Sequence, residues 1–329
     1  MSAADWEAAA SPKNPGMARV VEREYSFIFD SLKGRNLLFE WNLGAMKIPH
    51  PSLRMVLAAS LGVLLVVMAS RGVEFERLLE LLYQGRPKFL LAALALVLLS
   101  PFLRALRWRT LFSDQAPAMT TLVRAIVTGQ TLNLLMPLRS GDIARVLMMK
   151  DQKWMTAGTI AVEKGIDAAF LAGLCTLLPL VWMVPEWLEG PRVAAILVGS
   201  VFLALAVLIV PRLPNMKLQH SAGSLILLIG ISALLWCSGI LVNYSVLLFL
   251  SLEQPLVVSV ALLVILQIGV AVPSTPGKIG VFQELSVLGL SLFGIAKTPA
   301  LAFGLLVHSL ILLPTAAMAL AFWVLREKP

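Results

Sequence analysis

Long apolar runs, each about the length of a helix that crosses a bilayer, are the feature that most limits what this chain can fold into. A bilayer core needs about 20 apolar residues of α-helix. Hydrophobic residues make up 58% of the 329 and charged residues only 14%, so we expect an all-α integral membrane protein with about eight transmembrane helices. The predicted spans are residues 53–70, 88–108, 161–184, 191–211, 223–250, 256–273, 281–296 and 299–325.

One further apolar stretch, residues 118–138, has cations on both sides, with Arg109 before it and Arg145 after it. If this stretch enters and leaves on the cytoplasmic side, both termini are cytoplasmic and 21 of the 27 Lys and Arg residues lie in cytoplasmic segments. The positive-inside rule favours that count. A full crossing would instead invert the first two spans and place residues 104–109 outside. We therefore interpret 118–138 as a re-entrant, broken helical segment.

Residues 1–52 differ from the rest of the chain, because they are charged, punctuated by Pro and Gly, and have no long apolar period. We predict a polar N-terminal segment, disordered or interfacial, ahead of a polytopic membrane domain at 53–329. Two alternatives stay open. Met46 is a second candidate start, in which case residues 1–45 are not native. From Met46 a cleaved signal peptide is conceivable, but the apolar run ends at Arg71 without a small-residue cleavage site, which favours an uncleaved anchor.

Several function classes are disfavoured by composition. The net charge of +8 is not a nucleic-acid signal, because the basic residues are spread over loops between apolar runs. Cys175 and Cys237 both lie in apolar runs, so they indicate packing rather than a disulfide framework or a metal pair. Metal-binding His motifs and nucleophile elbows do not occur. The sequence therefore predicts no cofactor, no metal and no catalytic residue.

Two apolar stretches are broken by Pro and Gly, and each break carries ionisable side chains. The breaking residues are Pro137 and Gly141 in the first, and Pro273, Pro276, Gly277 and Gly280 in the second. Broken helix at membrane depth is tolerated only where protein buries it or where it lines a wet cavity. One such segment in each half is typical of a transporter's binding site. We therefore predict a pseudo-repeat of two halves whose breaks are neighbours in space.

Charged residues gather around the first break. Asp142 and Arg145 are three apart and share one helix face, while Glu163 and Asp167 are four apart and share another. A carboxylate at the bilayer centre costs roughly 2.5–3.5 kcal/mol, so these carboxylates need cationic partners. The candidate partners are Arg139, Arg145, Lys164 and Lys278. The alternatives are a surface ion pair of small value and an internal salt-bridge network that only fixes helix packing.

The second break offers a different chemistry. Lys278 stands in a glycine turn ahead of a helix, where backbone amides and an ammonium could hold a phosphate. Glu284, in the first turn, is favourable against the helix dipole whatever the protein does. His308 is either a packed, hydrogen-bonded histidine or a proton relay. A polar stripe along 118–138 is either the wall of a wet groove or an interfacial face with Arg124 at water.

Glycine, proline and charged residues at fixed spacings around these breaks match a family pattern. The matching positions are Gly129, Gln130, Asn133, Pro137, Gly141, Asp142 and Arg145, then Val162, Glu163, Lys164 and Asp167, and finally Pro273, Pro276, Gly277, Gly280, Val281 and Glu284. They resemble the lysylphosphatidylglycerol synthase transmembrane-region family, over residues 53–325. Arg107-Trp108 is similar to the family's Arg-Trp pair. The chain departs at Asp142, where Glu is usual, at Lys164, where Arg is usual, and at Lys278, where a second glycine is common.

The resemblance implies a flippase-like membrane domain, here without the soluble aminoacyl-transfer domain of the best-known members. Our hypothesis is a bacterial inner-membrane flippase or transporter that moves or binds phospholipid or another polar lipid, and is not an enzyme. The alternative is a membrane-embedded accessory or enzyme component of aminoacyl-lipid, glycolipid or hopanoid synthesis, with a lipid-modifying enzyme as a partner. The candidate substrate-binding residues are Arg139, Asp142, Arg145, Glu163, Asp167, Lys278 and Glu284.

Overall fold

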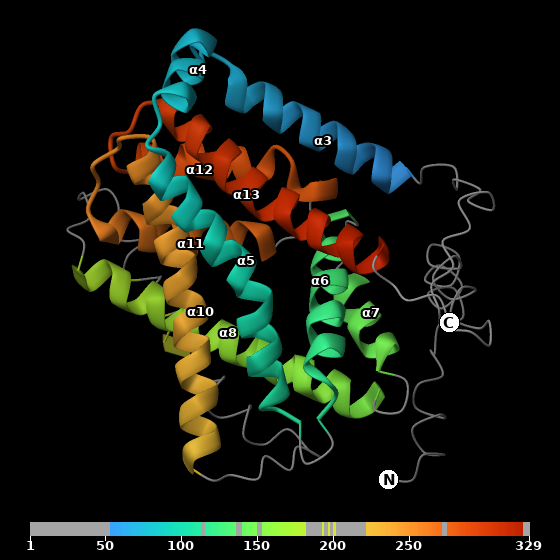
Figure 1. Cartoon of the computed structure of the whole chain (residues 1–329). Helices are drawn as coiled ribbons and strands as arrows, with labels where there is room; N and C mark the ends of the chain where they lie inside the picture. The colour runs from blue at the N-terminus through green and yellow to red at the C-terminus, as the bar shows by residue number, and fades with distance from the viewer. Residues whose placement is uncertain are drawn as a thin grey trace. The chain divides into compact units, whose positions relative to one another are not determined.

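The computed structural model of the protein describes residues 53–112, 116–135, 140–149, 153–181, 222–271 and 275–324, with Val193, Leu197, Ser200 and Val201 between them. These ranges contain ten α-helices, one short 3-10 helix and no strand (Figure 1). The elements are α3 (Leu53–Ser70), α4 (Phe75–Tyr83), α5 (Pro87–Arg109), α6 (Met119–Leu135), α7 (Ser140–Met148), α8 (Lys153–Val181), α10 (Ala222–Phe249), α11 (Leu256–Ala271), η3 (Pro276–Lys278), α12 (Val281–Ser291) and α13 (Lys297–Val324).

Most predicted spans coincide with helices, and the chain is an all-α membrane protein. Three helical stretches in the described ranges are long and apolar enough to cross a bilayer, namely Pro87–Arg109, Leu225–Phe249 and Lys297–Val324. α3 matches the predicted 53–70, and α11 matches 256–273 to within two residues. The predicted polar segment 1–52 and nearly all of the predicted span 191–211 lie outside the described residues.

Large apolar side chains cover much of the outer surface of these helices. Leu91 of α5, Ile226 of α10 and Leu313 of α13 are among the most exposed. In water such surfaces would be patches that demand a partner. On helices of this length they are the surfaces that acyl chains cover.

The prediction that residues 281–296 form a full span is wrong. α12 has only 11 residues, which at 1.5 Å per residue is about 16 Å, against a hydrocarbon core of about 30 Å. Phe282 and Leu290 of this helix are buried in the protein core rather than facing lipid. Hydropathy does not distinguish these two reasons for being apolar.

α12 instead returns along α11 as the second limb of a helical hairpin. Gly289 lies against Leu262 and Ile265, and Gly269 lies against Leu285. Because later residues of α12 meet earlier residues of α11, the two helices are antiparallel. The second break, with η3, forms the tip of this hairpin.

α6 and α7 form a matching hairpin around the first break. α6 is one continuous helix, and Gly129 on it lies against Gly141 and Arg145 of α7. The Asn133 Oδ1 atom accepts a hydrogen bond from the Gly141 N–H (2.9 Å), which satisfies one free donor at the start of α7. α7 thus packs back against α6, as a re-entrant segment requires, but α7 supplies the return limb rather than 118–138 itself. Pro137 and Arg139 lie outside the described residues.

α8 begins at Lys153, eight residues before the predicted span 161–184. Thr156 and Thr159, in this additional part, are buried. Buried polar side chains lower the hydropathy of residues 153–160, although these residues belong to the same helix, and the predicted span therefore began too late. The amphipathic helix α4 was likewise not predicted.

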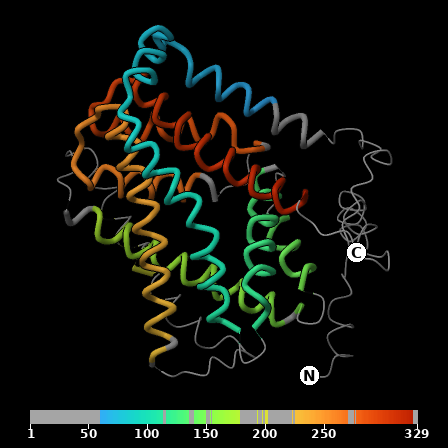
Figure 2. The backbone as a smooth tube through the Cα atoms, viewed as in Figure 1, coloured from blue at the N-terminus to red at the C-terminus, as the bar shows by residue number. Residues whose placement is uncertain are grey.

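Two apolar cores hold together the helices whose backbone Figure 2 traces. One joins α3, α4, α5, α10, α11, α12 and α13. The other joins the C-terminal part of α5 with α6, α8 and the N-terminal part of α10, around Trp108, Leu122 and Val127. α5 and α10 pack side by side and belong to both cores.

α13 passes both hairpins. Its first residues meet the α3–α4 turn, where Lys297 Nζ donates to the Met68 carbonyl (2.8 Å). Near its other end, Phe322 lies 6.0 Å from the Arg124 guanidinium of α6. His308 is 11 residues after Lys297, or about 16 Å along the helix. A residue in this position lies well inside α13 rather than at either end.

Candidate functional site

Arg107, in the last turn of α5, is the centre of a buried charge cluster. Its side chain is fully buried. Arg107 Nη1 donates to Asp167 Oδ1 (2.6 Å), and Nη2 donates to Glu163 Oε1 (2.9 Å) and Asp167 Oδ2 (3.1 Å). Both carboxylates come from one face of α8, as their spacing of four predicts. Charge-assisted bonds of this length are the strong kind.

Glu163 links two arginines. Its Oε1 accepts from Arg107 and its Oε2 accepts from Arg145 Nη2 at 2.7 Å. All three side chains are buried, so each pays a desolvation cost that only its neighbours offset. The prediction that the carboxylates need cationic partners is confirmed for Glu163 and Asp167, and Arg145 is one of the predicted partners.

The cluster becomes more accessible away from this centre. Asp142 lies 3.7 Å from Arg145 Nη1 and 3.3 Å from Lys164 Nζ. The side chains of Asp142 and Lys164 are 21% and 45% exposed, and that of Asp167 is 30% exposed. The cluster thus has an enclosed centre and a rim that a ligand could reach.

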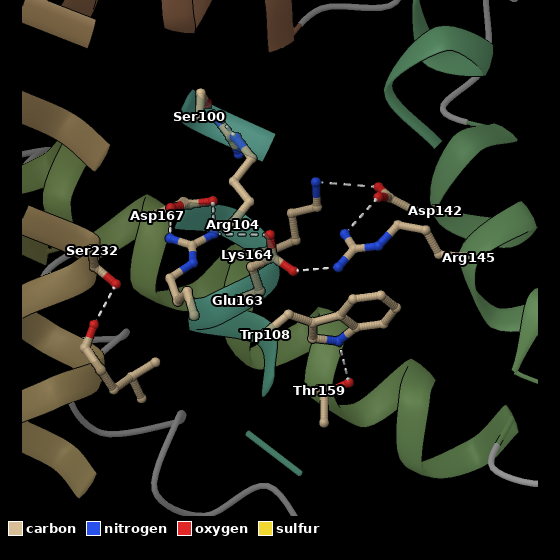
Figure 3. Close-up of polar contacts among 12 residues, drawn as sticks. Ser100, Arg104, Trp108, Asp142, Arg145, Thr159, Glu163, Lys164, Asp167 and Ser232 are labelled. Carbon is tan, nitrogen blue, oxygen red and sulfur yellow. Dashed lines mark hydrogen bonds and ion pairs between the residues drawn. The ribbon is translucent and has the colours of Figure 1, made fainter. Parts of the chain in front are cut away.

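Trp108 supports the cluster from below Arg145. The Arg145 guanidinium lies 4.1 Å from the centre of the Trp108 ring, a cation–π arrangement. Trp108 Nε1 donates to Thr159 Oγ1 (2.9 Å; Figure 3), and Thr159 Oγ1 donates to the Thr156 carbonyl (2.8 Å). The buried threonines at the start of α8 therefore fix the ring on which Arg145 rests.

The structure brings together four of the predicted site residues, and Arg107 joins them although it was not among those predicted. The four are Asp142, Arg145, Glu163 and Asp167. An arginine inside an apolar run is by default a functional candidate, and that signal could have identified Arg107. Arg139 lies outside the described residues.

Hydrogen bonds through His308 hold the tip of the second hairpin. His308 Nε2 lies 2.9 Å from the Gly277 carbonyl, and Nδ1 lies 3.1 Å from Gln283 Nε2. A carbonyl only accepts, so Nε2 carries the hydrogen and Nδ1 accepts from Gln283. Gln283 Oε1 in turn accepts from the Gly280 N–H (2.8 Å). His308 is thus the packed, hydrogen-bonded histidine of the first alternative.

The same tip uses backbone conformations that favour glycine. Gly277 and Gly280 have φ angles of 67° and 84°, and Lys278 has 56°. A Cβ on Gly280 would press against the Gly62 carbonyl of α3, so both the turn and its contact with α3 require glycine. Glu284 follows in the first turn of α12, and its buried Oε2 makes no hydrogen bond to the described residues.

The tip of the second hairpin lies against the C-terminal end of α6. α6 contacts η3, and a Cβ on Gly277 would lie 3.7 Å from the Leu134 carbonyl oxygen. The end of α6 that leads into the first break is thus beside the second break, but residues 136–139 and Pro273 lie outside the described residues, so the prediction that the breaks are neighbours stays a prediction. Leu134 is five residues after Gly129, which packs on Arg145. The meeting point and the charge cluster are therefore about 7.5 Å apart along α6.

Apolar outer surfaces, a buried charge cluster and two helical hairpins together define an all-α membrane protein with charged residues in its interior. The model of the family described as "Lysylphosphatidylglycerol synthase TM region" matches residues 55–319. The chain belongs to this family. No curated protein and no solved structure matches the chain.

Proposed function

We propose that this protein moves a phospholipid or related polar lipid between the leaflets of the bacterial cytoplasmic membrane. The observation that carries the proposal is the charge cluster, in which an enclosed centre leads to the accessible rim of Asp142, Lys164 and Asp167. A headgroup cannot cross hydrocarbon without polar partners, because each unsatisfied polar group costs several kcal/mol. The charged side chains at the accessible rim can replace the water molecules that otherwise solvate the headgroup.

The hairpins support a path rather than a surface site. The tip of the second hairpin meets the end of α6 beside His308, well within the length of α13, and about 7.5 Å along α6 from the cluster. Non-helical backbone at this depth is expected beside a polar path. In this proposal Lys278 and Glu284 act at the tip, and Arg145, Glu163 and their neighbours act at the entrance. Both termini would be cytoplasmic, as the distribution of cations favours.

Lipid movement in vesicles tests the proposal directly. Purified protein is reconstituted into phosphatidylglycerol-containing liposomes that carry a fluorescent phospholipid in both leaflets, and dithionite then bleaches the outer leaflet. Protein-free vesicles should lose about half of the signal, whereas vesicles with protein should lose clearly more as inner-leaflet lipid reaches the outside. A loss equal to that of protein-free vesicles, across several headgroups, would argue against transport.

A second function is favoured by the enclosure of the cluster's centre. Because Arg107, Glu163 and Arg145 are all buried, the cluster could hold helices in place for a protein that binds lipid as a component of lipid synthesis. The family's name refers to a synthase. Lipid binding without movement, together with co-purification of a lipid-modifying enzyme, would favour this alternative.

A further inference from the structure

Arg104 is the one cation of the cluster that lacks an acidic partner among the described residues. Arg107, Arg145 and Lys164 each lie within 3.3 Å of a carboxylate oxygen. Arg104 makes one hydrogen bond within the described part of the chain, from Nε to Ser100 Oγ at 3.4 Å. Its two terminal nitrogens, which form the fork of the guanidinium, have no protein acceptor there.

The cluster has one more positive than negative charge, and among the described residues the unpaired positive charge is that of Arg104. The four cations Arg104, Arg107, Arg145 and Lys164 face three carboxylates. Asp167 and Glu163 attract Arg104, while Arg107 and Arg145 repel it. These two carboxylates are already bonded to Arg107 and Arg145. One positive charge in this low-dielectric region is therefore available to an anion.

The side of α5 on which Arg104 lies shows whether its side chain faces the protein interior, as in a binding site, or faces the surrounding lipid. Phe102 and Leu106, 47% and 40% exposed, mark the outer face of this helix. Arg104 is two residues from each, which at 100° per residue puts it on the opposite, inner face, with Ser100 and Arg107. Its side chain nevertheless remains partly exposed. This inward-facing and still accessible arginine lies beside the cluster, with its side chain extending toward Ser100 (Figure 3).

We propose that Arg104 binds the phosphate group of a phospholipid headgroup. The guanidinium fork matches two oxygens of a phosphate, which a lysine ammonium does not. This inference rests on the proposed function for the choice of a lipid, since a free phosphate in water carries the same chemistry. In this inference Arg104 recognises the phosphate, while Arg107 and Arg145 hold the carboxylates of Glu163 and Asp167.

Thermal stabilisation by added lipid tests the inference without any transport measurement. Detergent-purified protein is titrated with short-chain phosphatidylglycerol, with diacylglycerol that lacks phosphate, and with inorganic phosphate, while the Tm is followed. Phosphatidylglycerol should raise the Tm of the wild-type protein, and the other two should not. Stabilisation by inorganic phosphate alone would assign Arg104 to a soluble anion and overturn the lipid.

Variants of Arg104 then locate the effect. Arg104→Gln should weaken the apparent affinity for phosphatidylglycerol at least tenfold. Arg109→Gln removes a charge from the exposed last turn of the same helix and should change it less than twofold. Equal weakening by both variants would reduce the effect to general surface charge, and unchanged affinity in Arg104→Gln would overturn the assignment.

A conservative variant covers the case in which Arg104→Gln fails to fold. Arg104→Lys keeps the cation but loses the fork, and should bind phosphatidylglycerol two- to tenfold more weakly than the wild-type protein. Wild-type affinity in this variant would contradict recognition by the guanidinium. If the wild-type protein moves no lipid in vesicles but its binding of phosphatidylglycerol still depends on Arg104, the transport proposal is refuted and this inference stands.

Discussion

Glu163 shows, at the scale of single residues, how a membrane protein keeps several charges in its interior. Its two carboxylate oxygens separate the guanidinium groups of Arg107 and Arg145, which would otherwise repel each other at low dielectric. Asp167 accepts hydrogen bonds from both terminal nitrogens of Arg107. Removing any one member therefore leaves a buried charge uncompensated, whereas removing a matched pair does not.

Arg107 should be the member on which folding depends most. Arg107→Met leaves Glu163 and Asp167 with Arg145 as the remaining buried cation, so we expect a loss of about 3–5 kcal/mol in the free energy of unfolding. Unfolding in detergent, followed by helical circular dichroism, measures the change. Arg109→Met, in the exposed last turn of α5, is the matched control and should lose little. Equal stability of the two variants would contradict the central place given to Arg107.

Trp108 offers a smaller and more specific test. Trp108→Phe keeps an aromatic ring for Arg145 but removes the Nε1–H that donates to Thr159. We expect a loss of roughly 1 kcal/mol, the usual net value of one such bond. A double-mutant cycle with Thr159→Val measures the coupling between the two side chains. Strictly additive losses would show that the observed hydrogen bond does not contribute.

At the scale of elements, α6 pairs with α7 and α11 pairs with α12 to form two helical hairpins, and each hairpin closes on small residues. Gly129 and Gly141 let α6 and α7 approach closely, while Gly269 and Gly289 do so for α11 and α12. Close backbone approach at small residues is how helices associate in lipid, where no hydrophobic force drives them together. The spacing of glycines around the breaks therefore has a packing explanation before it has a functional one.

Gly141 should not tolerate a side chain. A Cβ at this position would overlap the Gly129 carbonyl, so Gly141→Ala must separate the limbs of the first hairpin, at a cost of roughly 1–3 kcal/mol. Gly173→Ala, in α8, adds a methyl group where no atom lies within 4 Å and should cause no loss. Melting temperatures of the two variants decide the point. A Gly141→Ala protein as stable as Gly173→Ala would contradict the close contact.

Helices that consist of one long apolar run could be predicted from the sequence. Helices whose apolar side chains face protein could not be told apart from membrane spans. α3 and α13 match their predicted spans because one long apolar run corresponds to one helix. α12 was misjudged because its apolar side chains, such as Phe282, face protein. In the site, a cationic partner for Glu163, such as Arg145, could be predicted from the cost of a lone carboxylate. The role of Arg107 could not, because it depends on a contact with Glu163, which is 56 residues further along the chain.

At the scale of the whole molecule, the first hairpin fixes a topology that can be measured. Ala118 directly precedes α6 and Lys153 begins α8, the next described helix after α7, and both residues are exposed. After replacement of Cys175 and Cys237, single cysteines at these two positions should react with a membrane-impermeant thiol reagent from the same side of the membrane, which the cation distribution predicts to be the cytoplasm. Labelling from opposite sides would make the hairpin a full crossing.

The central claim is that the charge cluster serves lipid movement and not only folding. Replacing Arg145 and Glu163 together by Met removes one matched pair, and leaves Arg107 with Asp167 and Lys164 with Asp142. Such a variant should recover most of the stability that either single variant loses. The decisive measurement is its rate of phospholipid movement in the dithionite assay. We predict a folded protein whose rate is at least tenfold below wild type, whereas a folded double variant with the full wild-type rate would contradict the claim.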